Sequence, residues 1–130
     1  MRKEVIKTDK AASGKVPLSQ AIRSEGWLFC SGQLPIDPKT GQVVPGGVAA
    51  QTRQVLENLK AVCEAGGTSL QNAVKVTILM QDLAELQEMN KVFEEYFGVV
   101  DPPARTTFQA ARIIADAKLE IELQAFVPRG

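Results

Sequence analysis

The chain has 130 residues, of which 45% are hydrophobic and 23% charged, and its 15 basic residues balance its 15 acidic ones. This length predicts one domain over residues 1–130, and the neutral balance disfavours a surface that follows nucleic-acid phosphates. There is no histidine, which excludes the histidine-containing zinc, haem and catalytic-triad sites, and two cysteines alone predict no metal site.

The N-terminal segment MRKEVIKTDK has no apolar stretch of the kind that a secretory signal requires. No apolar run reaches the roughly 20 residues of a membrane-spanning helix. The two cysteines, Cys30 and Cys63, are too few for a secreted disulfide scaffold. We therefore expect a cytoplasmic protein with reduced thiols and no membrane contact.

The first part of the chain predicts an antiparallel start to a β-sheet. Short candidate strands cover Lys3–Lys7, Leu18–Ser24 and Trp27–Ser31, and Glu25-Gly26 has the composition of a turn between the last two. Asp37 to Gly41 (DPKTG) predicts a loop, because proline, glycine and aspartate all favour turns.

Two amphipathic helices follow. Residues 48–65 predict a helix that ends at Gly66-Gly67, with an apolar stripe formed by Val48, Thr52, Val55, Leu59 and Val62. A second helix ends at Gly98 and carries the stripe Leu86, Met89, Phe93 and Phe97. Asp82 with Glu85 predicts a capping box at its start.

The remaining strands are predicted at Val74–Met80, Arg105–Ala110 and Leu119–Val127. In the first of these, Val74 is expected to share the face of Val76, Ile78 and Met80. The order of three strands, helix, strand, helix and two strands indicates an α+β fold with two helices on one sheet face.

The sheet face away from the helices is then left uncovered. It would carry Thr77, Leu79, Phe108, Glu120 and Glu122, a mixture of apolar and charged side chains. A solvated antiparallel face can look like this, but mixed apolar faces tend to be covered. We therefore favour association between chains over a monomer.

Arg105 is the first candidate for chemistry, because Pro102-Pro103 stiffens the approach to it. A guanidinium can grip a carboxylate through two parallel hydrogen bonds, which a lysine cannot copy. The alternative is an ordinary surface or interface ion pair.

Glu120 is the second candidate, with Glu122 on the same strand face. Burial of that face in an oligomer would raise the pKa of a glutamate and allow it to move protons near neutral pH. The alternative is a solvated strand face on which Lys118 is the partner.

The segment after Cys30 is the third candidate. In Ser31-Gly32, a glycine at a strand end allows the backbone to approach a ligand, although a simple exit into a loop explains it equally well. Cys30 has no histidine to activate it as a nucleophile, and Cys63 lies near a helix stripe and is expected in the core.

In their order and spacing, these segments resemble the RidA/YjgF family, earlier named endoribonuclease L-PSP. No single motif is specific, but the match extends from about Lys15 to Val127. The segments that carry it are Pro17–Ala21, Ser31–Pro35, Gln51–Gln54, Asn58-Leu59, Val74–Thr77, Met89-Asn90, Pro103–Arg105 and Glu120–Glu122.

This resemblance implies a chorismate-mutase-like fold, with a single mixed sheet of about six strands and two helices packed on one face. It further implies a homotrimer whose active sites lie at the subunit interfaces. The implied activity is hydrolysis of reactive 2-imino or enamine acids to 2-keto acids and ammonia, with no cofactor.

The resemblance also implies residue roles. Arg105 matches the arginine that pairs with the substrate carboxylate, and Glu120 the glutamate that positions the attacking water. Ser31 and Gly32 match the loop at the imine end, while Asn90 and Thr107 match pocket positions, the latter often a cysteine.

Leu18 stands where many family members have a tyrosine, which predicts a wider and more apolar pocket. Two alternatives remain open at this point. One is a noncatalytic trimer that binds keto or imino acids, and the other is a pathway-specific deaminase, for example of an aminomuconate-like compound. The neutral charge and few aromatic residues argue against the RNA cleavage that the older name suggests.

Overall fold

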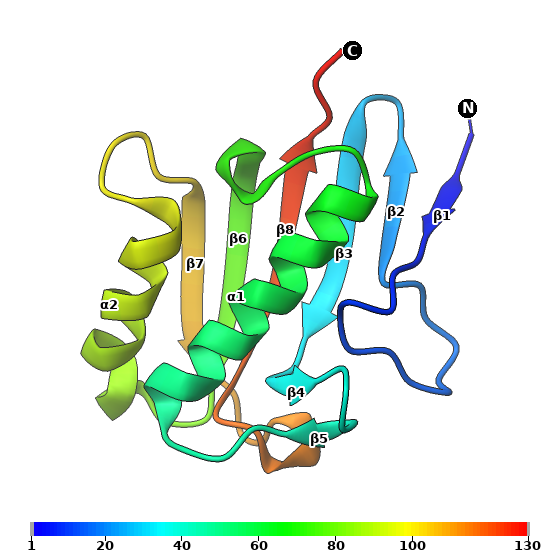
Figure 1. The fold of residues 1–130 in the computed structure, drawn as a ribbon. Coiled ribbons are helices and arrows are strands. Elements are labelled where there is room, and N and C mark those ends of the chain that lie inside the picture. The colour runs from blue at the N-terminus through cyan, green and yellow to red at the C-terminus, as the bar shows by residue number, and fades with distance from the viewer. Residues whose placement is uncertain (1, 130) are drawn as a thin grey trace.

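A computed structural model describes residues 2–129. Its main feature is a six-stranded sheet in the order β1-β2-β3-β8-β6-β7, in which only β6 and β7 pair in parallel. Two helices cover one face of this sheet (Figure 1). The α+β fold with one mixed six-stranded sheet is thereby confirmed. The main elements are β1 (Glu4–Ile6), β2 (Ala21–Ser24), β3 (Trp27–Gln33), α1 (Val48–Ala65), β6 (Ala73–Met80), α2 (Leu86–Phe97), β7 (Ala104–Gln109) and β8 (Leu119–Phe126).

A small second sheet was not predicted. The strands β4 (Ile36–Asp37) and β5 (Gln42–Val43) form an antiparallel pair on either side of the turn that DPKTG predicts. Short 3₁₀ turns complete the chain at η1 (Leu70–Asn72), η2 (Leu83–Glu85) and η3 (Ile114–Asp116).

The predicted strand at Leu18–Ser24 was too long, since β2 begins only at Ala21. Gln20 is the physical reason, because its side chain is occupied by the preceding loop. Its Nε2 donates to the carbonyl oxygens of Thr8 (3.0 Å) and Ala12 (2.9 Å), and its Oε1 accepts from the Thr8 backbone N–H (2.7 Å). The buried amide holds this loop against the sheet, with Leu18 outside the strand.

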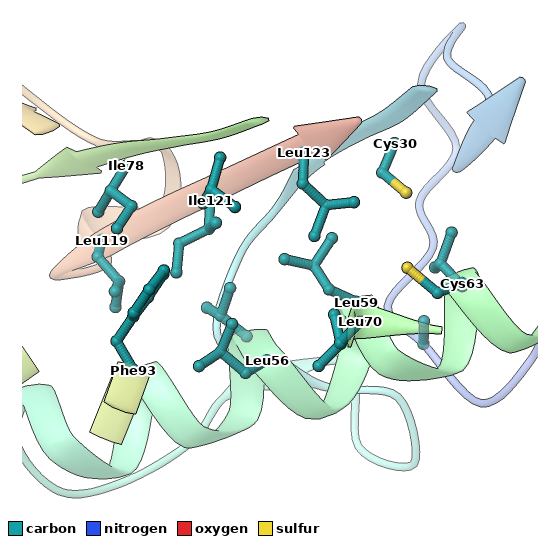
Figure 2. Packing of buried hydrophobic residues seen from close by; sticks show 14 of the residues in the cluster. Cys30, Leu56, Leu59, Cys63, Leu70, Ile78, Phe93, Leu119, Ile121 and Leu123 are labelled. Carbon is teal, nitrogen blue, oxygen red and sulfur yellow. The ribbon is translucent and has the colours of Figure 1, made fainter. Parts of the chain in front are cut away.

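The core lies between the sheet and the helices, as the helix stripes predict. All five stripe residues of α1 are buried, and Figure 2 shows Leu56 and Leu59 of α1 directed toward the β8 side chains. The predicted capping box is only half right. Asp82 accepts a hydrogen bond from the Ala84 backbone N–H (2.9 Å), but it caps η2, and α2 starts after Glu85 without a side-chain cap.

Strand β8 alternates strictly between the two faces of the sheet. Leu119, Ile121, Leu123 and Ala125 are buried beneath the helices, and the residues between them face the other side. The same alternation fails at one end of β6, where Val74 is exposed. A register shift between Ala73 and Lys75 makes Val74 the extra residue of a bulge, so its predicted place on the core face was wrong.

The face away from the helices, called the open face below, keeps large apolar side chains uncovered. The register places Trp27 and Phe29 of β3 beside Phe126 and Gln124 of β8. Phe29 is 47% exposed and Trp27 is 42% exposed. An exposed cluster of aromatic rings is typical of a surface that another chain covers.

Both cysteines are buried and free, and they face each other from β3 and α1 (Figure 2). The pKa of the Cys30 thiol is strongly raised, first by a hydrogen bond with Cys63 and then by burial. A protonated buried thiol is a poor nucleophile. The expectation that Cys63 belongs to the core is therefore confirmed, and Cys30 joins it.

Candidate active site

Arg105 lies near the start of β7, at the free edge of the sheet. It pairs with Val76 of β6, which in turn pairs with Leu123 of β8. Neighbours across a sheet share a face, and both of these partners are fully or almost fully buried beneath the helices. The Arg105 side chain therefore lies on the helix side of the sheet.

The guanidinium of Arg105 rests on an aromatic ring and borders a hollow. Its Cζ lies 4.9 Å from the ring centroid of Phe93 on α2. The hollow measures about 460 Å³ and is also lined by Asn90, Pro102 and Pro103. Among residues 2–129, no carboxylate lies within ion-pairing distance of Arg105. Burial lowers the pKa of Arg105, but a guanidinium stays charged at neutral pH.

Among the described residues, three buried side-chain atoms have no hydrogen-bond partner. Two of them lie near Arg105, and the third is the Oε1 of Gln33 on β3. Thr107 lies two residues after Arg105 and shares its face, and its buried Oγ1 is unpaired within the described part of the chain. The buried Oδ1 of Asn90 is unpaired as well. Buried polar atoms without partners are costly, so both indicate a place that a ligand or water completes. We call Arg105, Asn90 and Thr107 the arginine half.

Glu120 and Gly32 form a second group, on the open face. Glu120 pairs with Leu79 of β6, and a register shift between Cys30 and Gln33 makes a bulge at Ser31-Gly32 in the neighbouring strand. A side chain on Gly32 would collide with the Glu120 carboxyl group, whose Cδ would lie 2.9 Å from the added Cβ. A larger residue at position 32 would therefore displace the Glu120 carboxyl group. We call Gly32 and Glu120 the glutamate half.

Burial raises the pKa of Glu120, and the negative charge of Glu122 on the same face raises it further. Both groups line a hollow of about 190 Å³ with Gly32 and Leu79. Lys118 does not neutralise Glu120, as one interpretation of the sequence had it, because it pairs with Glu85 (3.3 Å). A carboxyl group with a raised pKa is suited to accepting and returning a proton.

Ser31 precedes Gly32 in the bulge and Leu18 lies in the loop before β2, and neither lines the hollow of the glutamate half. The Ser31 hydroxyl donates to the carbonyl oxygen of Ser19 (2.6 Å) and so ties the bulge to the loop before β2. Leu18, in that loop, is 60% exposed and borders a separate hollow of about 570 Å³ with Lys7 and Ser19. None of the other candidates lines that larger hollow.

Within one chain, the two halves do not meet. Arg105 and Thr107 lie on the helix side of the sheet, whereas Glu120, like its neighbours Leu79 and Phe108, lies on the open face. The signal for this separation is present in the sequence, because residues three apart on a strand, such as Arg105 and Phe108, take opposite faces. The contact between Arg105 and Phe93 was missed, because Phe93 carried only the signal of a helix stripe.

The described residues contain no group of three or more histidine, cysteine, aspartate or glutamate side chains that could hold a metal ion. No helix among residues 2–129 has the length and apolar character needed to cross a membrane.

Known proteins resemble this chain over nearly its whole length. The family model for endoribonuclease L-PSP matches residues 8–127. A RutC family protein of Pyrococcus horikoshii is 48% identical over 124 residues, which cover 95% of this chain and 98% of that protein. The 2-iminobutanoate/2-iminopropanoate deaminase of Mus musculus is 37% identical over 121 residues, 92% of this chain and 88% of the mouse protein.

This chain is also similar to a solved structure over nearly its whole length. The Rid family protein YyfA of Yersinia pestis superposes with a TM-score of 0.93 at 40% identity, covering 97% of this chain and 100% of that one. A TM-score this high, over complete chains, indicates the same strand order and the same placement of helices.

Proposed function

Because the chain belongs to the endoribonuclease L-PSP family, that of the RidA/YjgF proteins, we propose that it hydrolyses reactive 2-imino and enamine acids to 2-keto acids and ammonia. Relatives that cover most of this chain, including the mouse protein, are named as deaminases of such compounds. The cytoplasmic location expected from the sequence stays a prediction.

One observation carries this proposal, namely the unpaired guanidinium of Arg105. It lies at a hollow, lacks a carboxylate partner among residues 2–129, and has the buried unpaired oxygen of Thr107 on its own face. Guanidinium groups in this state bind carboxylates in bidentate fashion. In a 2-imino acid, the carbon of the C=N bond is attached directly to the carboxylate. A carboxylate bound at Arg105 would therefore place the C=N bond beside the neighbouring polar groups.

Glu120 is the proposed acid and base. A water molecule adds to the imine carbon while its proton passes to the carboxylate of Glu120. Glu120 returns that proton to the nitrogen, which gives a carbinolamine. Glu120 then takes the hydroxyl proton of the carbinolamine and passes it to the nitrogen, the C–N bond breaks as the C=O bond forms, and ammonia leaves. The raised pKa of Glu120, caused by burial and by Glu122, brings it closer to neutral pH and favours these transfers.

These roles require two copies of the chain. Arg105 and Glu120 lie on opposite sides of the sheet in one copy, so one substrate can touch both only where the arginine half of one copy meets the glutamate half of another. The exposed aromatic residues of the open face support such packing. We propose a homotrimer with three interface sites, in which Leu18 and Ser31 border the glutamate half.

Arg105→Ala tests the proposal. Imines generated in place from several amino acids serve as substrates, and ammonia release is measured. We expect Arg105→Ala to lose activity by a factor on the order of 1,000 while keeping its fold and assembly, because both substrate anchoring and orientation are lost. Arg105→Lys should recover little, since a lysine cannot make two parallel hydrogen bonds. Arg112→Ala, at an exposed arginine paired with Asp116, is the matched control and should stay active.

A fully active Arg105→Ala protein would refute the anchor role. Binding of a 2-keto acid without any ammonia release from the unaltered protein would instead identify a noncatalytic binding trimer. Gene context and activity on ring-cleavage products would test the narrower possibility of a pathway-specific deaminase.

A further inference from the structure

The contact between Arg105 and α2 is not used by the proposed reaction. Phe93 is buried on α2, and its ring stacks on that of Phe97 with centroids 4.4 Å apart and planes 28° apart. The guanidinium carbon of Arg105 lies 4.9 Å from the Phe93 centroid. Three planar groups, from residues 93, 97 and 105, thus form one layered contact at the edge of the sheet.

We propose that Phe93 is a positioning residue that holds the Arg105 guanidinium over its ring and directs the N–H groups of that guanidinium into the hollow, with Phe97 fixing the ring from the side. This inference rests on the proposed function, because it concerns the group that we expect to bind the substrate carboxylate.

The partner that holds an arginine in place decides how many of its N–H groups remain free for a substrate. A carboxylate partner would fix the guanidinium but would use the same in-plane N–H groups that a substrate needs. An aromatic ring attracts the cation through its π face and leaves those N–H groups free. Among residues 2–129, Arg105 has the ring as a partner and no carboxylate, which is the arrangement expected of a pre-oriented receptor.

Phe93 can do this because α2 itself is held in place. The Tyr96 hydroxyl donates to Glu57 of α1 (2.7 Å), and Arg53 of α1 pairs with Glu95 (2.7 Å). The side chain of Gln71 donates to the Tyr96 carbonyl oxygen (3.2 Å). Several independent contacts therefore fix the helix that carries the ring, while β7 lies at a free edge of the sheet.

The test separates the electrostatic role of the ring from its packing role. A fluorinated phenylalanine, 3,4,5-trifluorophenylalanine, keeps the ring shape but withdraws charge from its face, so it weakens attraction to a cation and not packing. We would introduce it at position 93, and in a matched control at position 97, and measure binding of 2-oxobutanoate, a 2-keto acid of the product class, together with kcat and KM.

We expect fluorination at position 93 to weaken binding and raise KM by about 5-fold, within the range that cation–π contacts span, with kcat changed by less than about 2-fold. The same group at position 97 should change binding by less than about 2-fold, since that ring does not contact the guanidinium. Phe93→Leu should weaken binding of 2-oxobutanoate at least as much as fluorination at position 93 does. Phe93→Tyr keeps an aromatic ring and should bind 2-oxobutanoate as the unaltered protein does. Val92→Ala, which removes buried volume from the same helix, controls for stability alone.

The outcomes are distinguishable from failure of the proposed function. Unchanged binding by both the fluorinated and the Phe93→Leu proteins, alongside lost binding by Arg105→Ala, overturns the positioning role and leaves the carboxylate anchor intact. Equal losses from fluorination at positions 93 and 97 overturn it as well. Unchanged binding by Arg105→Ala removes the proposed function itself.

Discussion

The two faces of the sheet differ in how they are completed. On the helix side, Ile121 and Leu123 of β8 are buried entirely by α1 and α2 of the same chain. On the open face, Glu120 and Glu122 of the same strand share a surface with exposed aromatic rings such as Phe29. One face provides the stability of the chain by itself, and the other is left for association and for the glutamate half of the site.

The arginine half lies at the boundary between the part of the sheet that the helices cover and the part that is left accessible. Arg105 lies on the helix side, yet at the edge strand, where Phe93 of α2 packs against its guanidinium. A charged group can be tolerated on a core face at this place because the hollow beside it remains accessible. The comparison predicts that substitutions on the open face affect assembly and activity, whereas substitutions in the core beneath the helices, outside the arginine half, affect folding.

Among the substitutions that test this comparison of the two faces, a charge placed on the open face has the largest expected effect. Phe29→Glu should dissociate the proposed trimer and reduce deamination by a factor on the order of 100 or more, because an unpaired charge in an apolar interface costs several kcal/mol. Light scattering and ammonia release would measure this, with circular dichroism to follow the fold. Lys60→Glu, on an exposed part of α1, is the control. A trimeric and active Phe29→Glu protein would contradict the assignment of the open face.

The second prediction concerns the helix side of the same strand. Ile121→Ala should lower the free energy of unfolding by about 3 kcal/mol, because it leaves a cavity in a packed core. Gln124→Ala, which faces the opposite side, should cost less than about 0.5 kcal/mol in the isolated chain. Urea denaturation at one fixed protein concentration would compare them. Equal losses for the two variants would show that the faces do not divide stability in this way.

Much of this division could be predicted from the sequence, because it follows from periodicity. The 3.6-residue stripe of α1 and the two-residue alternation of β8 each identify a buried side before any tertiary contact is known. Both were confirmed. The resemblance of motif order and spacing to one family then added the chorismate-mutase-like fold to this arrangement.

The rest depends on contacts that no local pattern encodes. The strands β4 and β5 have two residues each, too few to show alternation. The exposure of Val74 results from a bulge against β8. The pairing of Arg105 with Val76 and of Glu120 with Leu79 depends on the strand order β8-β6-β7. The partnership of Arg105 with Phe93 is likewise a tertiary contact.

The third prediction uses the pH dependence of the open face. Because burial and then Glu122 raise the pKa of Glu120 above its ordinary value of 4.5, the folded protein holds this proton more tightly than the unfolded chain does. The stability that this provides is present below that ordinary value and is lost as the pH rises through the higher folded value. Glu120→Gln should therefore raise Tm at pH 8, by on the order of 2 °C, and change it little at pH 4.

Thermal unfolding at both pH values would measure this effect, and Glu88→Gln, on the exposed side of α2, is a suitable control. A stabilisation of equal size at pH 4 and pH 8 would show that the charge of Glu120 is not the cause. The same variant should lose most of its deaminase activity, so the open face would gain stability where it loses function.

The smallest expected effect concerns Leu18, which lies beside the glutamate half and is 60% exposed in the single chain. Leucine offers no hydroxyl group and less width than an aromatic ring, so the proposed pocket should accept bulky apolar imino acids. Leu18→Tyr should shift the ratio of kcat/KM values toward small imino acids by about 3-fold to 10-fold, since pocket contacts of this size discriminate by roughly 1 kcal/mol. Imines generated in place from alanine and from leucine would provide the two substrates, with Val16→Tyr in the same loop as the control. An unchanged ratio would mean that the loop before β2 does not border the substrate, and the glutamate half would then consist of Gly32 and Glu120 without it.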